Sequence, residues 1–128
     1  MTIYLDTSAA AKLLVEEPES AGLAAFLDGI EAEEHIMSSA LLETELRRFG
    51  TRLGLPQSAI TELLARVGLV EPDRSLFYEA GLLPGRHVRS LDALHLATAV
   101  RVGATAVVAY DHRLLEAARG LGLSTLSP

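Results

Sequence analysis

The chain has 128 residues, of which 49% are hydrophobic and 22% are charged, a balance typical of a folded globular protein. It contains no cysteine, which excludes disulfide frameworks, thiolate metal sites and cysteine nucleophiles. Its net charge of −6 has the wrong sign for a protein that binds nucleic acid through a basic surface as a whole.

Short strands alternate with helices along the chain, and the breaks between them fall at turn-forming Gly and Pro residues. The predicted strands are 2–5, 35–37, 68–71, 105–110 and 124–126. The predicted helices are 7–15, 18–29, 39–53, 56–66, 74–83, 91–102 and 112–120. Because strands separated by helices are joined by right-handed crossovers, we expect an α/β fold with a mostly parallel sheet and helices on both faces. The length favours one domain over residues 1–128.

The first strand ends in an acid, Asp6, which is followed by two small hydroxyl residues, Thr7 and Ser8. In parallel sheets the functional groups lie beyond the carboxyl ends of the strands. Asp111 stands in the same position after the strand 105–110. If these two strands are neighbours in the sheet, the two acids will meet.

The helix 39–53 carries two acids with different surroundings. Its apolar spacing predicts a buried stripe made of Leu42, Leu46, Phe49 and Leu53. Glu43 falls in the first turn, where the helix dipole favours any acid. Glu45 lies on the opposite shoulder of the stripe, with Arg48 and Arg52 following on its side. It is either a functional acid or one half of a surface ion pair with Arg48.

Positive charge is concentrated in arginine, with ten arginines and one lysine. Two clusters stand out, "ELRRFGTR" and "PGRHVRS". The planar guanidinium fork suits phosphate, although such clusters also serve surface solubility. The candidate phosphate contacts are Arg48, Arg52, Arg86 and Arg89.

The helix 91–102 is apolar or small at almost every position, as in a helix buried nearly all round. Ser90 is its expected N-cap, which places Asp92 in the first turn. His95 shares a face with Asp92 at a spacing of three residues. Taken alone, these two residues fit a dipole-satisfying acid and a hydrogen-bonded core histidine.

The most apolar segment, "LDALHLATAVRVGATAVVAYD", does not fit a membrane span, because His95, Arg101 and a glycine interrupt it. The N-terminus lacks the basic region of a signal peptide and reaches Asp6 at once. We therefore expect a soluble, cytoplasmic protein without a membrane partner.

Together, the four acids at element ends or core-facing shoulders suggest a common site. Carboxylates brought close together raise one another's pKa, and a divalent cation removes this cost. Oxygen ligands without cysteine suit Mg²⁺ or Mn²⁺ and not zinc. Such an ion lowers the pKa of a bound water and neutralises charge on phosphate. The four acids are Asp6, Glu45, Asp92 and Asp111.

Four segments, "YLDTSA", "SSALLETELRR", "SLDALHLATA" and "YDHRL", resemble PIN-domain proteins in order and spacing, and in particular VapC-type toxins of toxin–antitoxin pairs. The resemblance spans essentially the whole chain. It implies a three-layer α/β/α sandwich, a Mg²⁺- or Mn²⁺-dependent endoribonuclease and a homodimer. It also implies a cognate VapB-type antitoxin whose tail enters the active-site groove.

The resemblance assigns the four acids to catalysis and makes Asp6, Asp92 and Asp111 the metal ligands. Ser8 and His95 are expected to support them, and the four candidate arginines to contact RNA. One position departs from the family: Ala109 stands where many relatives carry Thr or Ser. The hydroxyl support there is missing, which leaves open whether Asp111 binds metal directly or through water.

Other protein classes fit less well. A phosphoacceptor receiver domain needs a lysine after a late strand, whereas Lys12 lies in the first helix. A P-loop nucleotide-binding protein is excluded because no GxxxxGK[ST] pattern occurs. With 5% aromatic residues, a base-stacking RNA module lacks a platform. The remaining alternative is a catalytically inactive PIN-like domain that binds protein or RNA.

Overall fold

The computed structural model describes residues 1–30 and 34–128, which form five strands, seven α-helices and one short 3₁₀ helix. The strands are β1 (Thr2–Leu5), β2 (His35–Ser39), β3 (Gly68–Val70), β4 (Ala106–Val108) and β5 (Ser124–Leu126). The helices are α1 (Thr7–Ala10), η1 (Ala11–Leu13), α2 (Ser20–Asp28), α3 (Leu41–Leu53), α4 (Gln57–Leu64), α5 (Arg74–Gly81), α6 (Ser90–Arg101) and α7 (His112–Gly120).

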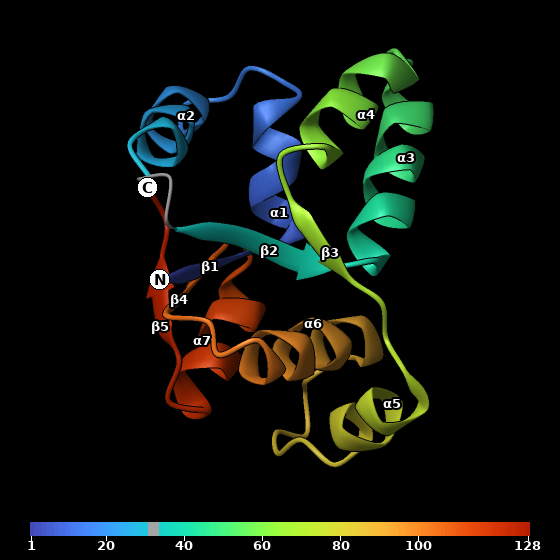
Figure 1. Cartoon of the computed structure of the whole chain (residues 1–128), viewed down its shortest axis with the longest axis vertical. Coiled ribbons are helices and arrows are strands. Elements are labelled where there is room, and N and C mark those ends of the chain that lie inside the picture. The colour runs from blue at the N-terminus through green and yellow to red at the C-terminus, as the bar shows by residue number, and fades with distance from the viewer. Residues whose placement is uncertain (31–33) are drawn as a thin grey trace.

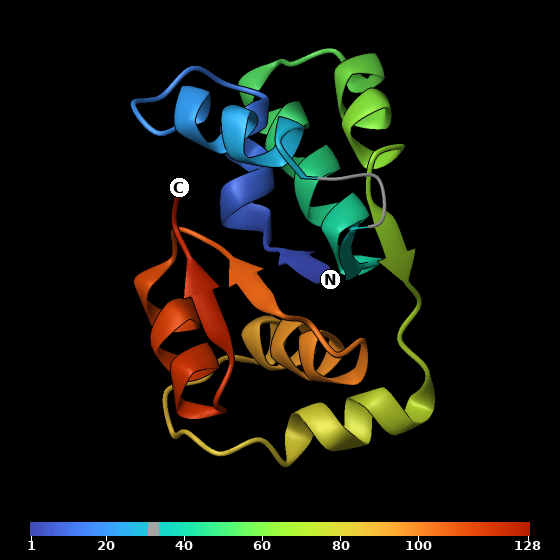
Figure 2. The same ribbon diagram turned by 60° about the vertical axis from the view of Figure 1, so that its left-hand side comes forward.

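The five strands form one sheet in the order β3-β2-β1-β4-β5, and every neighbouring pair is parallel. Helices α1 to α4 lie on one face of the sheet, and α6 and α7 lie on the other, with α5 packed on the outer side of α6 (Figure 1). The turned view shows the same three layers (Figure 2). The expected α/β/α sandwich is therefore confirmed, and β1 and β4 are neighbours, as the meeting of their acids requires.

Alternating side chains of β1 pack on opposite faces of the sheet, as the pleat of a strand dictates. Ile3 and Leu5 belong to the core beneath α1 to α4. Tyr4 points the other way and packs with Leu96 of α6 and Val107 of β4. This alternation brings the phenol of Tyr4 into the α6 layer, next to the polar groups of that helix.

Helix α6 is buried nearly all round, as its composition predicts, since every side chain from Ala93 to Ala99 is inaccessible to solvent or almost so. Its last residue, Arg101, pairs with Asp73 and Glu79 at 2.9 Å each and thereby attaches α5 to α6. In the described part of the chain, no helix combines the length and apolarity that crossing a membrane requires.

Two local predictions are wrong. Ser90 is the first residue of α6, and the N-cap is Arg89, which makes no capping side-chain hydrogen bond. In α3 the buried stripe runs Leu42, Leu46, Gly50, while the Leu53 side chain is 54% exposed. The cause is the close approach of α4: a Cβ on Gly50 would lie 2.3 Å from Cδ1 of Ile60, so this contact fixes which face of α3 is covered.

Candidate active site

The strand order places the topological switch point of the sheet between β1 and β4. β1 pairs with β2 and β4, and the chain order of the strands reverses at this point, where parallel sheets bind their ligands. The backbone amide of Asp6 donates to the carbonyl of Val108 at 3.0 Å, so the end of β1 is fixed to the end of β4. Asp111 follows three residues after Val108 as the N-cap of α7.

Asp6 is buried and held by its own turn. One carboxylate oxygen, Oδ2, accepts hydrogen bonds from the Ser8 hydroxyl at 2.6 Å and from the Ser8 amide at 3.1 Å. The Ser8 hydroxyl in turn accepts from the backbone amide of Tyr110 at 2.9 Å. Ser8 therefore joins the acid after β1 to the chain after β4.

Asp111 uses one carboxylate oxygen to cap α7. Its Oδ1 accepts from the amide of Arg113 at 2.9 Å and from that of Leu114 at 3.4 Å. Because capping uses Oδ1 and no residue of 1–30 or 34–128 donates to Oδ2, the second oxygen is available to a ligand.

Asp92 reaches the same edge from α6, because this helix leads directly into β4 and its N-terminus must lie at the carboxyl end of the strands. Burial raises the pKa of Asp92, and the negative charges of Asp111 and Asp6 raise it further, against the opposing effect of Arg113 and His95. No residue in the ranges 1–30 and 34–128 donates a hydrogen bond to the Asp92 carboxylate. Asp92 is therefore repelled by the negative charges of Asp111 and Asp6 at this edge of the sheet.

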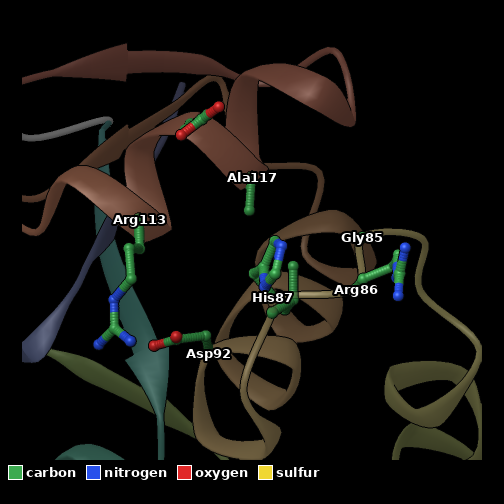
Figure 3. A pocket seen from close by; sticks show the side chains of 8 residues that line it. Gly85, Arg86, His87, Asp92, Arg113 and Ala117 are labelled. Carbon is green, nitrogen blue, oxygen red and sulfur yellow. The ribbon is translucent and has the colours of Figure 1, made fainter.

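An open hollow of about 200 Å³ adjoins Asp92. Figure 3 shows the Asp92 carboxylate and the Arg113 guanidinium facing each other at one side of it. The other wall comes from the loop before α6, including Arg86 and His87. The hollow thus combines two acids, Asp92 and Glu116, with the arginines Arg86 and Arg113, whose guanidinium groups suit phosphate.

Glu45 enters the site from the second turn of α3. Its Oε1 accepts a hydrogen bond from the Thr7 hydroxyl at 2.9 Å and lies 2.6 Å from Nε2 of His95. Burial alone would raise the pKa of Glu45, but the hydrogen bonds with His95 and Thr7 outweigh it and leave that pKa below its usual value. Glu45 is therefore an ionised acid held by groups of two other helices. It contacts His95 and does not form the surface ion pair with Arg48 that was the alternative.

His95 is 2% exposed and uses both ring nitrogens. Nε2 contacts Glu45, and Nδ1 lies 2.7 Å from the hydroxyl of Tyr4. Burial would lower the pKa of His95, but the bond to Glu45 and the charges of Asp6, Glu45 and Asp92 leave it raised. His95 thus connects the buried sheet to a carboxylate at the site.

The remaining predicted residues lie outside this network. Glu43 is exposed and pairs with Arg47 at 3.0 Å, one helical turn away. The four candidate arginines are all exposed or partly exposed, and Arg86 alone among them lines the hollow at Asp92.

Three residues at the site were missed by sequence reasoning: Tyr4, Thr7 and Arg113. Thr7 could have been identified from the sequence, since its hydroxyl follows directly after Asp6. The indication for Tyr4 was weaker: a buried phenol needs a hydrogen-bond partner, but the sequence does not say which. Arg113 follows Asp111 by two residues, but nothing in the sequence indicates that it faces Asp92.

The three aspartates have suitable donor atoms for the predicted metal ion, but their side chains are not arranged as a metal site. Across residues 1–30 and 34–128, no three or more His, Cys, Asp or Glu side chains form a group that could hold a metal ion. The donor chemistry of the three aspartates fits Mg²⁺ or Mn²⁺, because it is all oxygen and carries unbalanced negative charge. The side chains would have to move closer together on binding.

Comparison with known proteins gives a consistent result. The family model for the PIN domain matches residues 3–120. Ribonuclease VapC35 of Mycobacterium tuberculosis is 44% identical over 133 aligned residues, which cover 98% of this chain and 96% of that protein. Ribonuclease VapC47 of the same organism is 39% identical, with 98% and 96% covered. The crystal structure of M. tuberculosis VapC20, a Sarcin-Ricin loop cleaving toxin, superposes with a TM-score of 0.78 at 18% identity, over 98% of this chain and 99% of that one.

Proposed function

The chain belongs to the PIN-domain family, and from this premise we propose that it is a metal-dependent endoribonuclease that acts as the toxin of a toxin–antitoxin pair. The observation that carries the proposal is that Asp6, Asp92 and Asp111 lie at one edge of the sheet, where burial and the charges of Asp111 and Asp6 raise the pKa of Asp92. Such repulsion disfavours folding and is expected where acids are retained for chemistry. The ribonuclease names of relatives that match nearly the whole chain support the same activity.

In this proposal Asp6, Asp92 and Asp111 hold Mg²⁺ or Mn²⁺, and Glu45 completes the catalytic set. When bound, the ion supplies a water of lowered pKa and neutralises negative charge on the scissile phosphate. Asp6 offers its Oδ1, because Ser8 occupies the other oxygen. Asp111 similarly offers its Oδ2 and acts either directly or through a water.

Glu45 is ionised at neutral pH and half-buried, which suits a carboxylate that accepts a proton during hydrolysis. In this proposal the arginines that contact RNA phosphates are Arg48, Arg52, Arg86 and Arg89. Local positive charge of this kind is needed, because the protein as a whole is acidic.

We assign the protein two protein partners. One is a cognate VapB-type antitoxin, in keeping with the VapC names of its relatives. The other is a second copy of the chain, for which α5, its C-cap and α6 offer exposed large hydrophobic side chains, among them Phe77, Tyr78, Leu82 and Leu91. In this proposal residues 1–128 act as one PIN-like domain in the cytoplasm.

The proposal is tested with protein purified free of any partner and incubated with structured RNA. We expect cleavage in Mg²⁺ or Mn²⁺ and none after addition of EDTA. Equal cleavage in EDTA would point to another mechanism or a contaminating nuclease. RNA binding without cleavage in either metal would favour the inactive PIN-like module.

A further inference from the structure

A continuous hydrogen-bonded chain runs from the core of the sheet to Glu45. The backbone amide of Ser39 donates to the Tyr4 hydroxyl at 3.1 Å, and that hydroxyl lies 2.7 Å from Nδ1 of His95. Nε2 of His95 lies 2.6 Å from Oε1 of Glu45, which also accepts from Thr7 at 2.9 Å. The chain joins β2, β1, α6 and α3, four elements that are distant in sequence.

The direction of these bonds follows from the donors. A backbone amide can only donate, so the Tyr4 oxygen accepts from Ser39 and has its own proton left to donate. A tyrosine phenol is protonated at neutral pH, so that proton stays on the Tyr4 oxygen. When the ring of His95 is neutral, Nδ1 is then the acceptor and the ring proton lies on Nε2, from which it is donated to Glu45. The three links therefore support a single His95 tautomer.

Both donors reach the same oxygen of Glu45. His95 and Thr7 bind Oε1, whereas no described residue donates to Oε2. Two donors from different elements prevent the carboxylate from rotating, since α1 supplies Thr7 and α6 supplies His95. The free oxygen is thereby given a fixed direction. A buried histidine needs partners only inside the core, yet this one reaches a side chain that is 26% exposed at the site.

We infer that Tyr4, His95 and Thr7 are positioning residues, which fix the orientation of the Glu45 carboxylate and leave Oε2 to the substrate. This inference rests on the proposed function and adds to it the groups that orient one catalytic acid. Tyr4 acts through His95, and Thr7 acts independently from the turn that also carries Asp6.

The kinetic test compares Thr7→Val and Tyr4→Phe with the wild-type protein in an RNA cleavage assay. Removing the partners of a functional carboxylate typically costs ten- to a hundredfold in activity, and we expect kcat to fall about tenfold in each variant with KM little changed. Thr7→Ser keeps the hydroxyl and is expected to restore kcat. A matched control is Thr98→Val, which removes a buried hydroxyl whose one partner among the described residues is the carbonyl of Leu94.

A second readout needs neither metal nor activity. In EDTA at mildly alkaline pH, the side-chain nitrogen chemical shifts of His95 report which nitrogen carries the proton. The wild-type protein is expected to show the Nε2–H form, and Tyr4→Phe is expected to show a mixture of tautomers. Tyr4→Phe also leaves the Ser39 amide unpaired, so Thr7→Val, at a half-buried position, is the milder variant for kinetics.

The outcomes separate the two claims. If the wild-type protein cleaves RNA while Thr7→Val and Tyr4→Phe keep the wild-type kcat, the positioning inference is wrong and the proposed function stands. An Nδ1–H form of His95 in the wild-type protein would also overturn the inference. If the wild-type protein cleaves no RNA, the proposed function fails, and the positioning role fails with it.

Discussion

Glu43 and Glu45 stand two positions apart on α3 and meet different surroundings. Glu43 is exposed and pairs with Arg47, an interaction worth little at a surface. Glu45 accepts two hydrogen bonds from buried or half-buried groups and is ionised. The direction of one side chain thus decides which of the two acids can act at the site.

We predict that Glu45→Gln lowers RNA cleavage at least about a hundredfold, because an amide oxygen still accepts from Thr7 and His95 but cannot take up a proton. The fold should be retained for the same reason. Glu43→Gln is the matched control and should keep wild-type cleavage. Loss of activity in Glu43→Gln, with Glu45→Gln active, would reverse the assignment of the two acids.

At the scale of the elements, the end of α3 depends on a glycine in a left-handed conformation. Gly54 has φ of +68°, and its amide closes the last turn of the helix. A side chain at this backbone conformation costs about 1 kcal/mol. Gly81, the last residue of α5, has no positive φ, and a Cβ added to it would meet no atom within 4 Å.

We therefore predict opposite effects for the same substitution at these two glycines. Gly54→Ala should lower the free energy of unfolding by about 1 kcal/mol, and Gly81→Ala should raise it by roughly 0.5 kcal/mol. Urea denaturation measures both. Equal shifts of the same sign would mean that the end of α3 is not held by its backbone conformation.

The elements themselves were predictable, because each depends on local spacing and turn residues. All predicted strands and helices occur, with shifts of a few residues at their ends. The outward side of Leu53 was not predictable, since the packing of α4 against Gly50 decides it. The bonds of Glu45 to Thr7 and His95 span 38 and 50 residues of sequence, so only the folded chain reveals them.

For the whole molecule, the acidic net charge makes RNA binding depend on a few local arginines. Replacing a contacting residue among Arg48, Arg52, Arg86 and Arg89 by Ala should weaken binding and reduce the salt dependence by about one unit of slope. Arg119→Ala is the control, because Arg119 lies at the end of α7 away from the capping Asp111. If all four variants keep the wild-type slope, the arginines serve solubility or antitoxin binding.

The order of the strands in the sheet decides which acids lie at the same edge. Asp6 and Asp111 lie at the same edge of the sheet because β1 and β4 are neighbours, and Asp92 lies there too because α6 leads into β4. Folding raises the pKa of Asp92 above its value in the unfolded chain. The folded protein therefore loses stability as the pH rises from the pKa of Asp92 in the unfolded chain to its higher pKa in the folded protein. Above both pKa values the full loss of stability is present.

The most direct measurement is the melting temperature of the wild-type protein and of Asp92→Asn, each in EDTA and in Mg²⁺ or Mn²⁺ at neutral pH. In EDTA, Asp92→Asn should melt no lower than wild type, because the repulsion from Asp6 and Asp111 is removed. The metal should raise the melting temperature of the wild-type protein and have much less effect on the variant. Asp73→Asn, which loses a pairing with Arg101 at the start of α5, is the control and should melt lower with an unchanged metal response. A clear drop for Asp92→Asn in EDTA, with the metal response unchanged, would contradict the shared metal site.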